Sequence, residues 1–277
     1  QALDDVLFDP QDMATSILVE DSNNPNVAIR RWTDSQLDEV EKLGLGWTAL
    51  FSDLSWFLDN RDKFMKLNNI CDVVRGERRG WDAMFILSPS SSKQLDKKFL
   101  TPYLKNINGH YGLTIGEFDS FAFVCLLSPE DLKLPENISA KKWIDSFAKK
   151  NNKAGKPLTT SLKIANGEWY QFKIKAYADF VLPLNPDTRL YTVRTLTKTA
   201  LNQRLICLSL KKNYENDIAF IHALLNSTVS MLMIEMLGFG RGLGVLDITS
   251  TKIKTGFWIF DPSLFTKDAR SKVIDAF

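Results

Sequence analysis

The feature that most restricts the fold of this chain is a series of short apolar runs rich in β-branched and aromatic residues. From residue 67 onward these runs are separated by clusters of proline, glycine, serine and lysine, which is typical of strands joined by turns. The runs cover residues 70–74, 83–87, 121–127, 169–174, 191–196 and 205–210. Because strands dominate and do not alternate with helices, the pattern predicts an α+β domain with a mixed or antiparallel sheet.

Helical periodicity is confined to a few segments. Residues 33–43 predict a helix that Gly44 ends, and residues 52–66 predict a second amphipathic helix, so the first part of the chain is a partly helical leader. One long helix is predicted over 215–237, with Gly238 as its stop. A lysine-rich segment, 141–157, predicts an exposed helix and loop.

The net charge of +2 conceals an uneven distribution. Residues 1–41 carry two basic and ten acidic residues, a balance of −8, whereas the remainder has a balance of +10. Residues 189–212 contain six lysines or arginines and no acidic residue. A basic body of this kind is compatible with nucleic-acid binding and equally with an ordinary solvated surface, so charge alone leaves both interpretations open.

Several classes of enzyme lack their usual signatures here. The sequence contains no HExxH, GxSxG or GxxxxGK[ST] motif, and only two histidines, of which His222 lies in an apolar helical pattern typical of a core residue. The glycines at 238–244 follow a predicted helix, whereas a dinucleotide-binding motif must follow a strand and open a helix. We therefore expect no catalytic residue and no metal site in this chain.

Cysteine usage and hydropathy indicate a cytoplasmic protein. The three cysteines are far apart and form no CxxC pair, which fits a reducing compartment. The longest apolar runs, such as 121–127, fall short of the ~18 residues of a membrane span. The acidic N-terminus does not resemble a signal peptide, so we expect no membrane partner.

The sharpest local feature is a basic segment between two predicted strands. Two glycines, Gly76 and Gly80, bracket the turn, and the arginines Arg75, Arg78 and Arg79 lie in or beside it. Glycine permits positive φ and a close backbone approach, and the planar guanidinium group suits a phosphate or the O6/N7 edge of guanine. The alternative interpretation of this predicted hairpin is an ordinary basic surface turn.

This stretch resembles the R-G-x-x-T-G-x-N-x-x-F segment that opens the target recognition domain of many adenine-specific DNA methyltransferases of type II and type IIG restriction–modification systems. The matching positions are Arg75, Gly76, Gly80 and Phe85. Arg79 stands where the family usually has threonine, and Asp82 where it has asparagine.

Further stretches follow in the order of that family. Residues 99–105 look like its L-x-P-Y-L-K/R segment, and residues 192–206 are similar to its strand pair with alternating arginines. Residues 223–248 resemble its A-L-L-N-S helix, glycine-rich loop and following strand, and 259–262 match its D-P signal. Each motif is short, and their common order strengthens the resemblance.

The resemblance implies a division of the chain. Residues 1–25 are expected to be the tail of a preceding methyltransferase domain, 26–66 a helical linker, and 67–277 the DNA target-recognition domain. The family's asparagine-proline-proline-aromatic motif and S-adenosylmethionine loop are absent from the sequence. The resemblance therefore implies the C-terminal part of a bacterial N6-adenine DNA methyltransferase that does not catalyse methyl transfer alone.

In that family the expected cofactor of the parent enzyme is S-adenosyl-L-methionine, with none held by this chain. The expected partners are double-stranded DNA, the methyltransferase catalytic domain and a restriction nuclease. The predicted DNA contacts are Arg75, Arg78, Arg79, Lys105, Arg194, Lys198, Arg204 and Arg241, and the predicted structural glycines of the DNA-facing loops are Gly76, Gly80, Gly240 and Gly242. The alternative function is a protein–protein docking module that uses Trp81 and Trp143.

Overall fold

The computed structural model of the chain describes residues 32–46, 49–50, 54–107, 110–186, 190–240 and 246–277. The chain divides into two compact units, Gln1–Leu43 and Gly44–Phe277. The boundary falls inside the predicted 26–66 linker, and the predicted tail of a methyltransferase domain, residues 1–25, lies outside the described residues.

In the first unit the described residues contain the predicted helix, α2 (Asp34–Leu43). It begins with a reciprocal cap: the backbone N–H of Gln36 donates to Thr33 Oγ1 over 3.3 Å, and Thr33 N–H donates to Gln36 Oε1 over 3.0 Å. This pairing satisfies N–H groups that the first turn of a helix leaves without partners. The prediction of a helix over 33–43 is confirmed.

A mixed eight-stranded sheet forms the centre of the second unit, with strand order β2-β9-β7-β8-β4-β6-β3 and β5 beside β8. The strands are β2 (Cys71–Arg75), β3 (Ile86–Leu87), β4 (Leu100–Leu104), β5 (Thr114–Ile115), β6 (Phe121–Phe123), β7 (Ala178–Pro183), β8 (Val193–Leu201) and β9 (Leu205–Leu210). β8 pairs in parallel with β4 and β5, and the other pairings are antiparallel. The predicted α+β class with a mixed sheet is confirmed.

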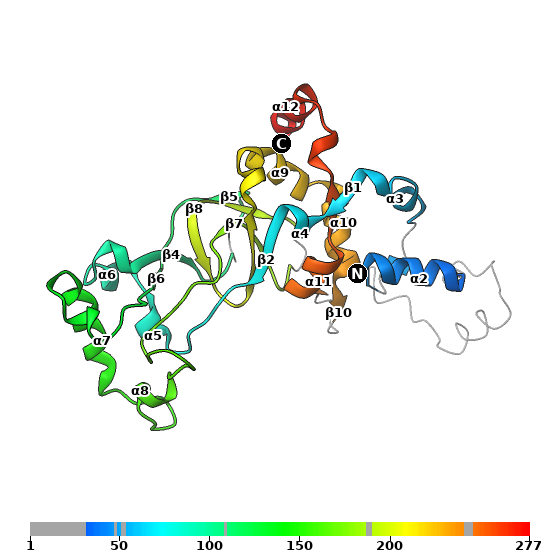
Figure 1. Cartoon of the computed structure of the whole chain (residues 1–277). Helices are drawn as coiled ribbons and strands as arrows, with labels where there is room; N and C mark the ends of the chain where they lie inside the picture. The colour runs from blue at the N-terminus through cyan, green and yellow to red at the C-terminus, as the bar shows by residue number, and fades with distance from the viewer. Residues whose placement is uncertain (1–31, 47–48, 51–53, 108–109, 187–189, 241–245) are drawn as a thin grey trace, which may run out of the picture. The chain divides into compact units, whose positions relative to one another are not determined.

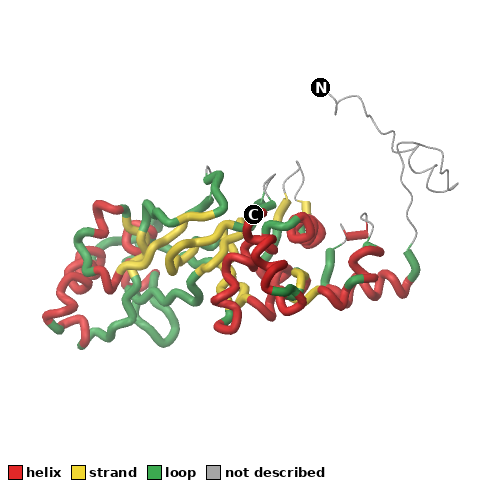
Figure 2. The backbone as a smooth tube through the Cα atoms, turned by 90° about the horizontal axis from the view of Figure 1, so that it is seen from above, coloured by secondary structure: helices red, strands yellow, loops and turns green. Residues whose placement is uncertain are grey.

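Helices lie at both ends of this sheet (Figures 1 and 2). At one end are α5 (Asp82–Phe85), α6 (Pro89–Ser92), α7 (Ile138–Ala148), α8 (Leu158–Ser161) and the short 3-10 turns η3 (Lys97–Phe99), η4 (Asp131–Lys133) and η5 (Pro135–Asn137). At the other are α4 (Leu67–Ile70), η6 (Lys212–Asp217), α9 (Ile218–Leu225), α10 (Thr228–Leu237), α11 (Ser250–Gly256), η7 (Pro262–Leu264) and α12 (Lys267–Ala276). A small ladder, β10 (Phe239–Gly240) with β11 (Leu246–Asp247), follows α10.

The predicted helix over 52–66 is wrong. The segment forms α3 (Ser55–Asp59), the turn η2 (Arg61–Lys63) and a strand, β1 (Phe64–Lys66). β1 pairs antiparallel with β12 (Trp258–Phe260), and the ring of Phe64 stacks on that of Phe260 at 4.4 Å. Pairing with β12, which is far away in the sequence, therefore decides the conformation of β1 against the local amphipathic pattern.

The predicted strand–turn–strand hairpin at 73–87 is also wrong. β2 pairs with β9 and β3 pairs with β6, so the two strands have different partners. Between them α5 buries Met84 and Phe85 completely. Residues 169–174 form no strand, although Tyr170 and Phe172 are buried in the same core as α5.

The single long helix predicted over 215–237 is broken. The helical stretch 212–225, made of η6 and α9, meets α10 at a bend of 73°. At the break the Asn226 side chain accepts from Thr192 N–H over 2.9 Å, and Ser227 Oγ accepts from Ser230 N–H over 3.3 Å as the cap of α10. The Ser227 side chain thus supplies a hydrogen bond that a continuous helix would make internally, and Asn226 ties the break to the residue just before β8.

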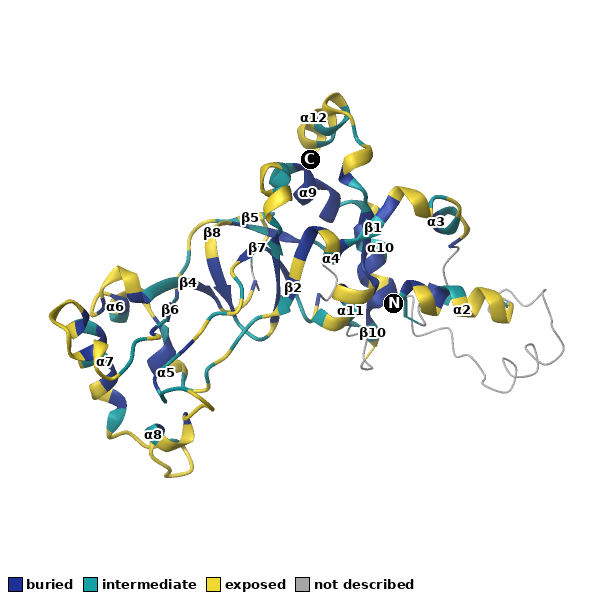
Figure 3. Ribbon diagram, in the orientation of Figure 1, coloured by how far each residue is buried: buried dark blue, intermediate teal, exposed yellow. Residues whose placement is uncertain are grey.

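Among the described residues, two clusters of buried apolar side chains lie around the central sheet, and further buried residues belong to α9, α10 and α11 (Figure 3). One surrounds β4, β6, α5 and α7, and the other lies around β7, β8 and β9. β9 is buried along almost its whole length, as expected for a strand covered on both faces. Within the described residues no single helix is long and apolar enough to cross a membrane; η6–α9 and α10 together pass by length and composition only.

His222 is a core residue, as its apolar surroundings in the sequence indicate. Its side chain is 3% exposed, stacks on Phe180 at 5.6 Å and lies 3.1 Å from the carbonyl oxygen of Thr192 through Nε2. Burial lowers the pKa of His222 below its ordinary value. The folded state therefore favours the neutral imidazole.

This pKa shift predicts that the protein loses stability as the pH falls below about 6.5, the ordinary pKa of histidine. Below that pH the unfolded state binds the proton more readily than the folded state, so the free energy of unfolding decreases by at most about 1.4 kcal/mol per pH unit. Urea unfolding at a series of pH values measures the loss. His222→Gln should make this part of the pH dependence shallower, and parallel curves for both proteins would contradict the assignment.

Candidate nucleic-acid interface

A hollow of about 390 Å³ lies where several strands of the central sheet end. β4 ends there at Leu104, β7 at Pro183, and the β8–β9 turn (202–204) and the loop after β2 complete the wall. We call it the basic pocket, after its charged and polar lining residues Arg78, Asp82, Tyr103, Lys105, Asn202 and Arg204. The structure thus brings three predicted DNA contacts, Arg78, Lys105 and Arg204, to one site.

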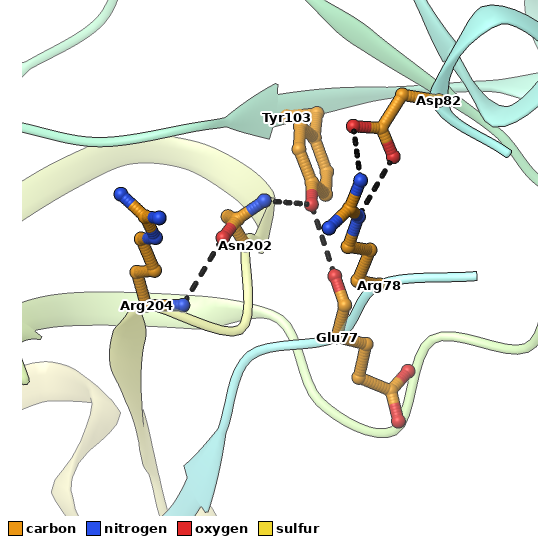
Figure 4. A network of polar contacts seen from close by, with 6 residues as sticks. All are labelled: Glu77, Arg78, Asp82, Tyr103, Asn202 and Arg204. Atoms are coloured by element: carbon orange, nitrogen blue, oxygen red, sulfur yellow. Dashed lines mark hydrogen bonds and ion pairs between the residues drawn. The ribbon is translucent and has the colours of Figure 1, made fainter. Parts of the chain in front are cut away.

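A buried tyrosine connects the elements of this pocket (Figure 4). The Tyr103 hydroxyl donates to the Glu77 carbonyl oxygen over 2.9 Å and accepts from Asn202 Nδ2 over 3.1 Å. Asn202 Oδ1 accepts in turn from the backbone N–H of Arg204 over 3.1 Å. Burial raises the pKa of Tyr103 to about 12, so the hydroxyl stays protonated and keeps its donor role.

The loop after β2 lies directly against the β8–β9 turn, and glycine makes this approach possible. Gly76 N–H donates to the Leu205 carbonyl over 2.9 Å, and Glu77 N–H donates to the Leu201 carbonyl over 2.7 Å. A Cβ atom on Gly76 would lie 2.2 Å from the carbonyl oxygen of Asn202. Gly80, further along the loop, has φ +105°, a conformation that favours glycine.

The pocket is electropositive because few carboxylates face it. Arg78 forms a two-pronged pair with Asp82, Nε to Oδ1 at 3.1 Å and Nη2 to Oδ2 at 3.2 Å, and both side chains are about half exposed. Lys105 and Arg204 are exposed, and no carboxylate of the described residues pairs with either. Three cations therefore share a lining that holds one carboxylate, Asp82.

Two neighbouring groups border the pocket without lining it. Arg75 is exposed at the end of β2, and its Nε donates to the Gln203 carbonyl over 2.6 Å. The Glu77 carboxylate is 2.8 Å from Lys175 Nζ, on the far side of the loop from the Tyr103 hydroxyl. The negative charge of Glu77 is thus neutralised by Lys175, which does not line the pocket.

Arg79 has a structural role that argues against the predicted DNA contact. Its Nε donates to the Gln171 carbonyl over 2.8 Å, and its Nη2 donates to the carbonyls of Trp169, over 3.0 Å, and Leu162. The guanidinium also lies 5.4 Å from the centre of the Phe85 ring. Burial lowers the pKa of Arg79, as expected for a cation enclosed by protein. Because the Arg79 guanidinium already donates to three carbonyls, few of its N–H groups remain for a ligand.

The remaining predicted contacts are not brought to the pocket. Arg194 and Lys198 lie on β8, well before the turn at its end; Arg194 is half-buried and Lys198 exposed. Arg241 and Gly242 lie outside the described residues. Gly240 is exposed at the end of β10, and a Cβ atom there would contact nothing within 4 Å, so the structure gives no steric reason for glycine.

Sequence analysis missed Tyr103, Asn202 and Gln203 as parts of this site. Tyr103 lies in the quoted 99–105 stretch, next but one to Lys105, and Asn202-Gln203 stands between two strand patterns, a position typical of a turn. The two tryptophans of the alternative docking module pack against the core cluster, and Trp143 Nε1 donates to the Met84 carbonyl over 3.0 Å.

The side chains that line the pocket are of types that bind ligands through charge and hydrogen bonds. Arginine and lysine bind phosphates, and guanidinium or amide groups form paired hydrogen bonds with base edges. Among the described residues no group of three or more His, Cys, Asp or Glu side chains could hold a metal ion.

The fold is similar to part of a restriction enzyme. No family model and no curated protein sequence matches the chain. Among solved structures, the type IIG restriction endonuclease BpuSI matches with a TM-score of 0.51 and 12% identity, over 96% of this chain and 33% of BpuSI. A type I restriction–modification S subunit from M. genitalium gives a TM-score of 0.34 at 14% identity, over 77% of this chain and 37% of the subunit, a score too low to indicate a shared fold. The chain thus spans about a third of the BpuSI length, and at this identity the likeness concerns the fold alone.

We expect Gly76→Ala to lower the free energy of unfolding by about 1–3 kcal/mol, because the added methyl group meets backbone oxygens that cannot rotate away. Urea unfolding measures the change. Gly240→Ala is the matched control, since its Cβ has open space, and should stay within about 0.5 kcal/mol of the unmodified protein. Equal effects of the two substitutions would show that the backbone at Gly76 is not packed tightly against the β8–β9 turn.

Arg79→Lys should lower the free energy of unfolding by about 2 kcal/mol, although it keeps the charge, because an ammonium group cannot reach three separate carbonyls. The neighbouring Arg78→Lys is the control: its exposed pair with Asp82 contributes little, so we expect a change within about 0.5 kcal/mol. Thermal or urea unfolding of both variants decides. An Arg79→Lys variant with an unchanged free energy of unfolding would contradict the structural role.

Proposed function

We propose that this chain recognises double-stranded DNA as the C-terminal part of a bacterial restriction–modification N6-adenine DNA methyltransferase. The observation that carries the proposal is the basic pocket, in which Arg78, Lys105 and Arg204 come together from three separate segments of the chain. The similarity in fold to part of BpuSI, and the ordered motifs in the sequence, support the same class of protein.

In this proposal some residues of the pocket contact phosphates and others contact bases. Lys105 and Arg78 contact phosphate oxygens, which gives affinity that depends on salt but not on sequence. The turn after β8 presents the half-buried Gln203 and the exposed Arg204, whose amide and guanidinium groups suit the major-groove edges of adenine and guanine. The Tyr103 and Asn202 hydrogen bonds hold that turn in a fixed position, which is what base reading requires.

Catalysis belongs to the rest of the parent enzyme. We propose that the methyltransferase domain binds S-adenosyl-L-methionine and receives the flipped adenine, while this chain sets the position of the DNA. A restriction nuclease is the second proposed partner, and the bacterial cytoplasm the proposed compartment.

The test is selection from a random duplex-DNA library by the full chain, followed by binding measurements at several salt concentrations. We expect enrichment of a short motif, and binding that weakens steeply with salt. The triple variant Arg78→Ala/Lys105→Ala/Arg204→Ala should reduce the slope of log K against log salt by up to about 2.7, one counterion per lost contact, and should abolish the enrichment.

The matched control removes the same number of charges elsewhere. Lys212, Lys254 and Lys267 are exposed and do not line the pocket, so their triple alanine variant should keep both the slope and the motif. If the unmodified chain retains no duplex even at low salt, the proposed function is wrong.

A further inference from the structure

A second hollow, of about 540 Å³, adjoins the basic pocket. The two share Arg78 and Asp82, so this ion pair stands between them. The second hollow is otherwise lined by Gly80, Trp81 and Ala83 on one side, and by the segment 152–154 on the other. The two hollows therefore lie next to each other, one at the β8–β9 turn and the other at the connection between α7 and α8, with Arg78 lining both.

That connection is a well-formed loop, which we call the lysine loop (residues 149–157). Asn151 and Pro157 form an isolated antiparallel bridge, and Asn152 N–H donates to the Lys156 carbonyl over 2.8 Å. The Asn152 Oδ1 atom accepts from the N–H groups of Ala154 and Lys156 over 3.0 and 2.9 Å. The loop is thus held in one conformation by its own hydrogen bonds.

The lysine loop carries uncompensated positive charge. Its four lysines, Lys149, Lys150, Lys153 and Lys156, are all exposed (Figure 3), and the sequence has no acidic residue from 146 to 167. Asp145, just before this stretch, is paired with Lys141. Lys150 differs from the others because its Nζ lies 4.0 Å from the centre of the Phe147 ring.

The position of the loop relative to the basic pocket is fixed by buried contacts. Leu158, which follows the loop directly, is completely buried in the same core cluster as Met84 and Phe85 of α5. Arg79, next to Arg78 in the chain, donates to the Leu162 carbonyl at the end of α8. The segment that carries Arg78 and the segment that carries the lysines are therefore joined through Arg79.

We propose that the lysine loop is a second DNA-binding surface, which contacts the phosphate backbone of the duplex whose bases are read at the basic pocket. This inference rests on the proposed function. The two adjacent hollows place cations in series along which a polyanion can lie: Lys153 lines one hollow, Arg204 lines the other, and Arg78 lines both. Lysine ammonium groups on a loop contact phosphates as point charges, so this surface adds affinity without sequence preference.

The test compares two triple variants of the full chain on labelled duplexes of unrelated sequence. Lys149→Gln/Lys153→Gln/Lys156→Gln should reduce the slope of log K against log salt by up to about 2.7, equally for every duplex, while the motif enriched from a random library stays the same. The exposed lysines Lys212, Lys254 and Lys267, changed to Gln, form the control and should leave the slope unchanged. Thermal unfolding should be unaltered in both, since all six side chains are exposed.

The outcomes separate this inference from the proposed function. An unchanged slope, or an equal reduction in the control, would overturn the lysine loop as a DNA contact. The basic pocket would still stand, provided that the unmodified chain enriches a motif and the basic-pocket variant does not. A change of the enriched motif would also overturn it, because the loop would then read bases. Failure of the unmodified chain to bind any duplex would overturn both.

Discussion

The close approach of two backbone segments at Gly76 is the contact on which the pocket depends. The strand β2 and the β8–β9 turn are more than a hundred residues apart in sequence, yet hydrogen bonds from Gly76 and Glu77 join them. This approach places the carbonyl of Glu77 within reach of the Tyr103 hydroxyl, which in turn holds Asn202. The positions of the surrounding cations follow from this buried network, because each cation is attached to a segment that the network fixes.

Adjacent arginines on the same loop make different contacts because their acceptors differ. Arg79 donates to three backbone carbonyls and becomes part of the scaffold. Within the described part of the chain, Arg78, one residue earlier, pairs only with the exposed carboxylate of Asp82. An exposed pair of this kind contributes little to stability, so a phosphate can replace the carboxylate at small cost. Charge alone cannot distinguish the two residues; the hydrogen-bond acceptors around them do.

The sequence predicts those parts of the fold in which local pattern and final structure agree. β9 is a run of apolar residues broken only by Ser209, and it forms over the predicted residues, 205–210. The hairpin at 73–87 could not be rejected from the sequence, because the true partner of β2 is β9, which pairs Cys71 with Leu210. The acceptors of Arg79 lie 83 to 92 residues further on and are equally invisible to local reasoning. Residue type and the family resemblance could single out Arg78, Lys105 and Arg204. They could not predict that the three residues come together, because this depends on the order of the strands in the sheet.

Rigid spacing explains how weak individual contacts can add up in this protein. A single exposed lysine or arginine gains little from one phosphate, and a flexible arm would lose part of that gain in ordering its side chains and backbone. Here the Arg79 hydrogen bonds and the buried Leu158 hold the lysine loop at a fixed separation from the β8–β9 turn. Once DNA contacts one of the two surfaces, the second contact is effectively intramolecular and costs less entropy. In the proposed complex, the half-buried Arg79 is therefore the residue that couples the two cationic surfaces, because its hydrogen bonds join the segments that carry them.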